Sequence, residues 1–141
     1  MENKYFTPDI SDIHVGYELE WKCQIRKQDW EVTICDSDLI SIIYDQYEHA
    51  DDEEPFNKQF RVPYLTKEQI ETEGWEFIKH HAGTEHCDFE KNEYSLAVDF
   101  NFRGNIHLRI YDGEQDNEFN YFSGKCKDIN TFRKICKLLE I

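Results

Sequence analysis

The stretch "FRVPYLTKEQIETEGWEFI", residues 60–78, contains the clearest local signal in the chain. Thr66 can accept a hydrogen bond from the backbone N–H of Gln69, and the Gln69 side chain can reach back to Thr66, which makes a capping box. Gly74 suits the left-handed position that follows the last turn of many helices. We therefore expect a two-turn helix over residues 67–73.

Apolar residues flank this short helix where they can pack across its two ends. Leu65 and Ile70 occupy the two positions of a hydrophobic staple, and Trp75 can pack back on Ile70 after the turn. Trp75 and Phe77 then begin a strand. The stretch thus predicts a short central helix that leads directly into a sheet.

Period-two alternation predicts strands on both sides of this helix. Apolar and polar residues alternate over residues 15–23, 30–34, 94–102 and 106–110, which is typical of strands with one buried face. Arg103, Gly104 and Asn105 read as a three-residue hairpin loop, which would pair Phe102 with Ile106. A further strand is expected over residues 119–122.

Two other apolar segments differ in how clearly they can be interpreted. "DLISIIYDQY", residues 38–47, fits either a buried strand or one short helix, and we favour a strand because isoleucine is β-branched. "DINTFRKICKLLEI", residues 128–141, predicts an amphipathic helix capped by Asn130. The side chains expected to face the core are Phe132, Ile135, Cys136 and Leu139.

These elements predict an α+β fold. We expect an antiparallel meander of five to six strands with a short central helix and a C-terminal amphipathic helix, the C-terminal helix lying against one face. The length of 141 residues is typical of one domain, and no repeat or Gly/Ser linker interrupts the chain, so residues 1–141 are expected to form a single domain. Aromatic residues make up 15% of the chain, which indicates a packed core.

The net charge is −14, from 16 basic and 30 acidic side chains, and it is unevenly distributed. Residues 125–141 carry five basic and two acidic groups, a net of +3, so residues 1–124 carry −17. Such a chain repels phosphate groups, and we expect no direct binding to nucleic acid or to an anionic membrane. A protein partner with a basic surface is the simpler expectation.

The cysteines and the apolar segments indicate a cytoplasmic protein. The chain has an odd number of cysteines and no CxxC pair, which favours reduced thiols over a disulfide framework. The first residues, "MENKYFTPDI", contain no signal peptide, and no stretch approaches the ~20 apolar residues of a membrane span. The five cysteines are Cys23, Cys35, Cys87, Cys126 and Cys136.

Two polar clusters contain residue types that can bind metal ions. His80, His81, His86 and Cys87 carry zinc-ligand chemistry, but their spacing does not match a zinc motif, and a polar loop is the favoured interpretation. Acidic residues alternate over residues 112–118, but the order of an EF-hand loop is absent, and a solvated hairpin tip explains them. We assign no metal and no cofactor.

Motifs of the common enzyme classes are missing as well. The chain has no G-x-S-x-G nucleophile elbow, no Walker loop and no dinucleotide-binding glycine motif. We therefore assign no catalytic residue, and we do not expect an enzyme.

Three stretches carry a resemblance to known proteins: "KYFTPDISDIHVGYELE", "PYLTKEQIETEGWEF" and "FSGKCKDINTFRKICKLLEI". In these stretches the chain resembles small uncharacterised proteins encoded by phages and prophages, many of them associated with Bacteroidota. The resemblance implies a phage or mobile-element origin and a host cytoplasmic setting. It implies no activity, and no functional residue follows from it.

The acidic stretch "YEHADDEEPFNK", residues 47–58, is the first candidate contact surface, since it holds five carboxylates within seven residues. Such charge can steer a protein towards a basic patch. Tyr44, Tyr47 and Phe56 flank this stretch and fit either an interface or the core. The expected partner-binding residues are Asp51, Asp52, Glu53, Glu54, Asp112, Glu114, Asp116 and Glu118.

We therefore expect a small acidic phage accessory protein that works by binding another protein. Inhibition of a host or defence protein with a basic surface is one possible role, and Glu18 and Glu20, at alternate positions on a strand, could then imitate the charge of nucleic acid. The alternatives are a virion-associated structural subunit, and a metal-dependent enzyme or small-ligand binder.

Overall fold

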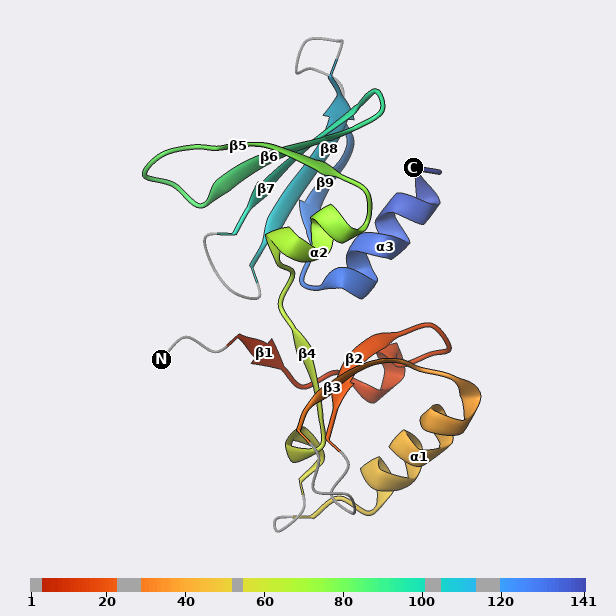
Figure 1. Ribbon diagram of the computed structural model, residues 1–141. Coiled ribbons are helices and arrows are strands. Elements are labelled where there is room, and N and C mark those ends of the chain that lie inside the picture. Colours follow the sequence, from red (N-terminus) through yellow and green to blue (C-terminus); the bar gives the residue numbers. More distant parts are fainter. Residues whose placement is uncertain (1–3, 23–28, 52–54, 101–104, 114–119) are drawn as a thin grey trace. The chain divides into compact units, whose positions relative to one another are not determined.

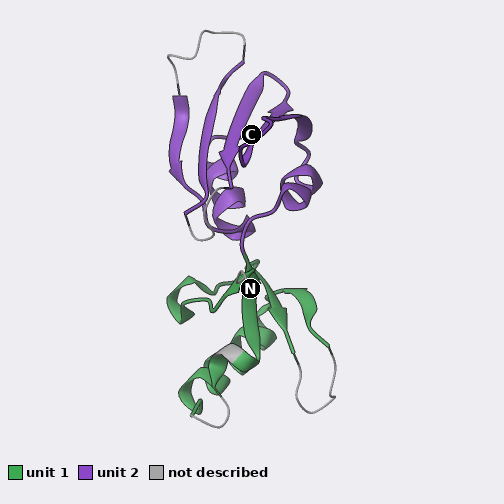
Figure 2. Cartoon of the chain, turned by 90° about the vertical axis from the view of Figure 1, so that its left-hand side faces the viewer, with its two compact units in different colours: residues 1–63 green, residues 64–141 purple. Residues whose placement is uncertain are grey.

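A computed structural model describes residues 4–22, 29–51, 55–100, 105–113 and 120–141 (Figure 1). The chain divides into two compact units, Met1–Pro63 and Tyr64–Ile141 (Figure 2). Each unit has a hydrophobic core of its own. The sequence predicted one domain over residues 1–141, and no linker composition marks the division between the units.

The α+β prediction is confirmed, with every strand pair antiparallel. The first unit contains a four-stranded sheet in the order β1-β4-β2-β3. Its strands are β1 (Tyr5–Phe6), β2 (Glu18–Trp21), β3 (Glu31–Ile34) and β4 (Phe60–Pro63). Its helices are α1 (Ser37–Glu48) and two 3-10 turns, η1 (Ile10–Asp12) and η2 (Phe56–Lys58).

Strands β2 and β3 are present where alternation predicted them, but their burial differs from the prediction. Leu19 is fully buried and lies directly opposite Thr33, so Thr33 shares the inner face. Val32 and Ile34 therefore lie on the other face, where they are 67% and 53% exposed. The register against Leu19 places the apolar stripe of β3 outward, and the predicted burial of that stripe was wrong. Val15, expected in the first strand, is also exposed.

The segment that we favoured as a strand, residues 38–47, lies in helix α1. The Asp36 side chain accepts a hydrogen bond from the Leu39 backbone N–H at 2.8 Å, which caps the helix. Leu39 and Ile43, four residues apart, are buried on one helical face. The cap and this spacing outweigh the β-branching of the isoleucines, whose effect on helix stability is small.

The second unit contains the predicted meander, a five-stranded sheet in the order β5-β6-β7-β8-β9. The strands are β5 (Glu76–His80), β6 (His86–Lys91), β7 (Tyr94–Asp99), β8 (His107–Asp112) and β9 (Asn120–Lys125). Leu96 pairs with Ile110, which is two residues away from the register that the predicted pair of Phe102 and Ile106 would set. A two-residue shift keeps the same face buried. Phe102 and the loop residues 103–104 lie outside the described residues.

Both predicted helices of the second unit are present, α2 (Lys67–Thr72) and α3 (Ile129–Leu138). The capping box of Thr66 and Gln69 is confirmed, and Gly74 has a φ of 96°. The predicted cap of α3 was wrong: Asp128, not Asn130, precedes the helix, and its carboxylate accepts from the Thr131 backbone N–H. An aspartate side chain reaches the free N–H groups one turn ahead, which Asn130, already inside the helix, cannot do.

The core of the second unit lies between one face of its sheet and the two helices. Leu65, Ile70 and Trp75 are buried in it, as the staple and the turn predicted. On α3, Phe132, Ile135 and Cys136 are buried and Leu139 packs against the core at its edge. Within the described ranges, no helix combines the length and the apolar character needed to cross a membrane.

The cysteines contribute to both cores. Cys23 lies outside the described residues, and the other four are free and buried. Burial raises the pKa of Cys35 and of Cys136 to about 11 each. These thiols are therefore protonated near neutral pH and behave as small apolar side chains.

Candidate functional site

Helix α1 exposes large apolar side chains to solvent around the part of its circumference that does not bury Leu39 and Ile43. Ile42, Tyr44 and Tyr47 are 44%, 43% and 49% exposed. Tyrosine is enriched in protein–protein interfaces because its ring gives contact area and its hydroxyl can still form a hydrogen bond. A helix of 12 residues that leaves three such side chains uncovered has more apolar surface than its own unit buries.

Carboxylates surround these side chains. From Asp29 to Asn57 the sequence holds ten acidic residues and no Lys or Arg. Asp38, Ile42 and Asp45 follow one another at spacings of four and three, so they share one face of the helix. The residues of what we call the acidic face of α1 are Asp38, Ile42, Tyr44, Asp45, Tyr47 and Glu48, all of them exposed.

The aromatic end of this face is anchored in the core of the first unit. Phe56 is 8% exposed and packs against the fully buried Phe60, with ring centroids 4.9 Å apart. Tyr47 in turn contacts Phe56. Of the three aromatic residues that the sequence left open between interface and core, Phe56 belongs to the core, whereas Tyr44 and Tyr47 lie at the surface.

His49, which ends α1, gives the acidic face a titratable group whose pKa is raised by its neighbours. Its Nδ1 lies 2.8 Å from the Asp45 carbonyl oxygen and 3.4 Å from the Asp45 carboxylate. The hydrogen bond to that carbonyl, and then the charge of that carboxylate, raise the pKa of His49 above its usual value of 6.5. Protonation of His49 would therefore reduce the negative charge at this end of the face.

The acidic residues predicted as partner contacts differ in their exposure, and several of them lie outside the described part of the chain. Asp51 is exposed, three residues beyond the end of α1, whereas residues 52–54 lie outside the described part. Asp112 is half-buried, and it hydrogen-bonds to Tyr121; partial burial and this carboxylate raise the pKa of Tyr121. Glu114, Asp116 and Glu118 also lie outside the described residues. Of the predicted contact residues whose positions the structure describes, Asp51 is therefore the exposed one.

The strand carboxylates considered as an imitation of nucleic acid do not form a free acidic row. Glu20 Oε1 accepts hydrogen bonds from Arg61 Nε at 2.9 Å and Nη2 at 2.7 Å. The Arg61 guanidinium also lies over the rings of Tyr5 and Trp30, at 3.7 and 4.1 Å from their centroids. The Glu20 charge is therefore neutralised within the first unit.

The histidines near the β5–β6 turn each have a separate neighbour. His80 Nε2 lies 2.6 Å from the Thr84 carbonyl oxygen, and His81 Nε2 lies 2.7 Å from Asp88 Oδ2. His86 Nε2 lies 3.3 Å from an oxygen of the Asp99 carboxylate, and Cys87 is buried. Among the residues with described positions, no three His, Cys, Asp or Glu side chains are grouped so that they could hold a metal ion.

Sequence reasoning missed Ile42 as a surface residue because it assigned this segment to a strand. Asp36 followed three residues later by Leu39, with Ile43 four residues further on, is the signal that would have identified the helix. With the helix assigned, the position of Ile42 between Asp38 and Asp45 indicates an outward residue.

Known proteins offer no further guide to this surface. Comparison with protein-family models, with curated proteins and with solved structures finds no match to the chain.

Proposed function

We propose that this protein acts by binding another protein that presents a basic surface, and that the acidic face of α1 is the contact. The observation that supports this most is the exposure of Ile42, Tyr44 and Tyr47 on a helix whose charged neighbours are all carboxylates. Exposed apolar area offers contact energy, and the surrounding charge of one sign selects the partner.

The two parts of this surface would have different roles. Tyr44 and Tyr47 would enter the partner and lose water, as tyrosines at interface centres do. Asp38, Asp45 and Glu48 would stay nearer the rim, where they speed the encounter with a basic partner and reject acidic ones. Association should therefore weaken as salt concentration rises, because exposed charges are screened.

The setting proposed for this binding is the cytoplasm of a phage-infected cell. The resemblance to small phage and prophage proteins supports that proposal. A host or defence protein with a basic surface, such as one that itself binds nucleic acid, is then the first class of partner to test. Occupying that basic surface would inhibit the partner by excluding its own anionic ligand.

The test is affinity capture from lysates of infected and uninfected cells, with the wild-type chain and two charge variants compared side by side. The first variant combines Asp38→Asn, Asp45→Asn and Glu48→Gln on α1. The matched control removes the same number of charges from exposed positions of the second unit, Glu68→Gln, Glu76→Gln and Glu90→Gln. Each capture is run at about 0.05 M and about 0.5 M salt, where screening lengths differ about threefold.

The proposal predicts a partner that the wild type and the control retain at low salt, and that the α1 variant and high salt both release. Capture of a protein is not sufficient by itself; the difference between the two variants is the result that counts. Equal capture by both variants would contradict the assignment of the contact to α1. Capture of phage structural proteins, independent of salt, would favour the virion-associated alternative.

A further inference from the structure

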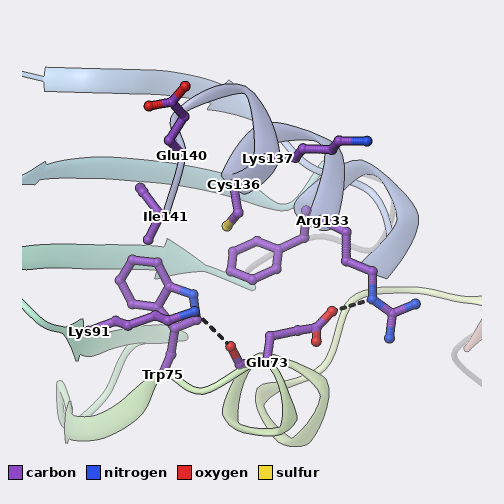
Figure 3. A pocket seen from close by; sticks show the side chains of 9 residues that line it. Glu73, Trp75, Lys91, Arg133, Cys136, Lys137, Glu140 and Ile141 are labelled. Atoms are coloured by element: carbon purple, nitrogen blue, oxygen red, sulfur yellow. Dashed lines mark hydrogen bonds and ion pairs between the residues drawn. The ribbon is translucent and has the colours of Figure 1, made fainter.

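The second unit contains a pocket of about 410 Å³ between the end of α2, the start of β5, the end of β6 and helix α3. Its apolar lining comes from Trp75, Phe132, Cys136 and Ile141. Charged side chains stand around this lining (Figure 3). They are Glu73, Lys91, Arg133, Lys137 and Glu140. A pocket of this size with an apolar lining and a few polar groups is typical of sites for small molecules.

The indole N–H of Trp75 is an unsatisfied donor in the wall of this pocket. Trp75 is 2% exposed, and its Nε1 is the one buried side-chain nitrogen or oxygen in the described part of the chain that has no hydrogen-bond partner. Burial raises the pKa of the Cys136 thiol, and an interaction with the Trp75 side chain lowers it in part, but a thiol sulfur is a weak acceptor and does not replace an oxygen partner. Buried polar groups in folded proteins almost always have partners, so an unpaired N–H at a pocket wall points to an acceptor that arrives with a ligand.

The charges around the pocket favour an anionic acceptor. Glu73 is ion-paired with Arg133, which leaves little attraction from either to a ligand charge. Lys91 donates to the Glu73 carbonyl oxygen at 3.1 Å, and in the described part of the chain it pairs with no carboxylate. In Figure 3 a dashed line joins the end of Lys91 to Glu73, whereas Lys137 and Glu140 point away from Trp75.

We infer that this pocket binds a small monocarboxylate with an apolar or aromatic body. The carboxylate would accept from the Lys91 ammonium and the Trp75 indole N–H, and the body would lie against Trp75, Phe132 and Ile141. Arg133 is ion-paired and Lys137 points away from Trp75, so Lys91 is left to match a single negative charge, and a second charge on the ligand would meet Glu73. Burial raises the pKa of Cys136 to about 11, so its thiol stays neutral and adds to the apolar lining. This site is separate from the proposed protein contact on α1 and does not depend on it.

The experiment follows the indole N–H resonance of Trp75 in a ¹⁵N-labelled chain while 2-naphthoate is added. Trp75→Phe identifies that resonance among those of the three tryptophans. The two matched probes are 2-naphthylmethanol, which lacks the charge, and acetate, which lacks the apolar body. We expect naphthoate to shift the resonance with a Kd of about 1 mM, as suits a ligand of this size, and each matched probe to bind at least tenfold more weakly.

Variants of Lys91 show whether the charge acts where we place it. Lys91→Met should weaken naphthoate binding about tenfold, the effect of losing one charged hydrogen bond. Lys91→Arg keeps the charge and should retain most of the binding, and Lys137→Met, a matched loss of charge on the outer rim, should change the affinity less than about twofold. The labelled spectra also report whether each variant keeps its fold.

Three results would overturn the inference. A Trp75 resonance that naphthoate does not shift would exclude the site, and equal affinity for naphthylmethanol would exclude recognition of an anion. Equal losses in the Lys91→Met and Lys137→Met variants would mean that a general electrostatic field, rather than Lys91, attracts the ligand. A preference for phenyl phosphate over naphthoate would contradict the assignment to a monocarboxylate.

Discussion

The ring of Tyr47 meets the ring of Phe56 edge to face, with centroids 5.5 Å apart and planes at 89°. This contact joins a residue that is 49% exposed to one that is 8% exposed. The geometry is the favourable one for two aromatic rings, and it limits the motion of the Tyr47 side chain. An exposed aromatic residue that is already held in place loses less freedom on binding, so Tyr47 is suited to be an anchor in a complex.

The different roles of these two rings predict different losses of stability. Phe56→Ala removes a buried ring and should lower the free energy of unfolding by about 3–5 kcal/mol. Tyr47→Ala removes one edge-to-face contact and half-exposed area, and should cost about 1 kcal/mol. Urea unfolding followed by circular dichroism measures both values. Similar losses would show that Tyr47 is a core residue and not a surface anchor.

Helix α3 offers a test of which residue caps it. The Asp128 carboxylate accepts from the Thr131 backbone N–H, the Thr131 hydroxyl and the Asn130 side chain, at 3.3, 2.6 and 2.8 Å. Asp128→Ala leaves these donors without their acceptor and should cost about 1–2 kcal/mol. Asn130→Ala, the matched change two residues on, should cost less than half as much in the same denaturation experiment. The reverse order would restore Asn130 as the cap.

The stacked Arg61 predicts that a conservative substitution will not be tolerated. Lysine keeps the charge but loses the planar group that lies between the rings of Tyr5 and Trp30 and that donates twice to Glu20. We expect Arg61→Lys to destabilise the chain by about 1 kcal/mol. Arg109→Lys is the control, since Arg109 lies over the single ring of Tyr111 at 4.6 Å. Equal effects of the two substitutions on the unfolding midpoint would count against this description of Arg61.

His49 predicts a dependence on pH. Because its pKa in the folded chain is raised, the stability that His49 contributes is fully present below its unfolded pKa of about 6.5 and is lost as pH rises through the folded value. The stability difference between wild type and His49→Gln should therefore be larger at about pH 5.5 than at about pH 8. An NMR titration should show a lower pKa of His49 in Asp45→Asn, though still above the usual value because the carbonyl contact remains. No change in that variant would exclude a contribution from the Asp45 carboxylate.

The sequence predicted the second unit well because its signals are local. The capping box of Thr66 and Gln69 and the alternation through Leu96 and Ile110 each depend on residues close in the chain, and both are confirmed. The sheet order β5-β6-β7-β8-β9 follows from short connections, which make neighbours in sequence neighbours in the sheet.

The first unit was harder to predict because its signals conflict. The isoleucines of α1 favour a strand by propensity, whereas Asp36 and the spacing of Leu39 and Ile43 favour a helix. The pairing of β4 with β2 joins residues about forty positions apart, which no local pattern reveals. Which face of β3 is buried depends on the pairing of Leu19 with Thr33, and this pairing is also a tertiary feature. Without these pairings, the sequence could not show that Glu20 is neutralised by Arg61 whereas the carboxylates of α1 stay exposed.

Hydroxyl-radical footprinting of the complex with the captured partner tests directly whether α1 forms the contact. Tyr44, Tyr47 and Tyr121 are exposed to comparable extents, 43%, 49% and 39%, so all three should be labelled in the free chain. If α1 forms the contact, Tyr44 and Tyr47 lose labelling in the complex while Tyr121, which hydrogen-bonds to Asp112 in the second unit, keeps it. Protection of Tyr121 with continued labelling of Tyr44 and Tyr47 would contradict the claim and would assign the contact to the acidic segment that begins at Asp112.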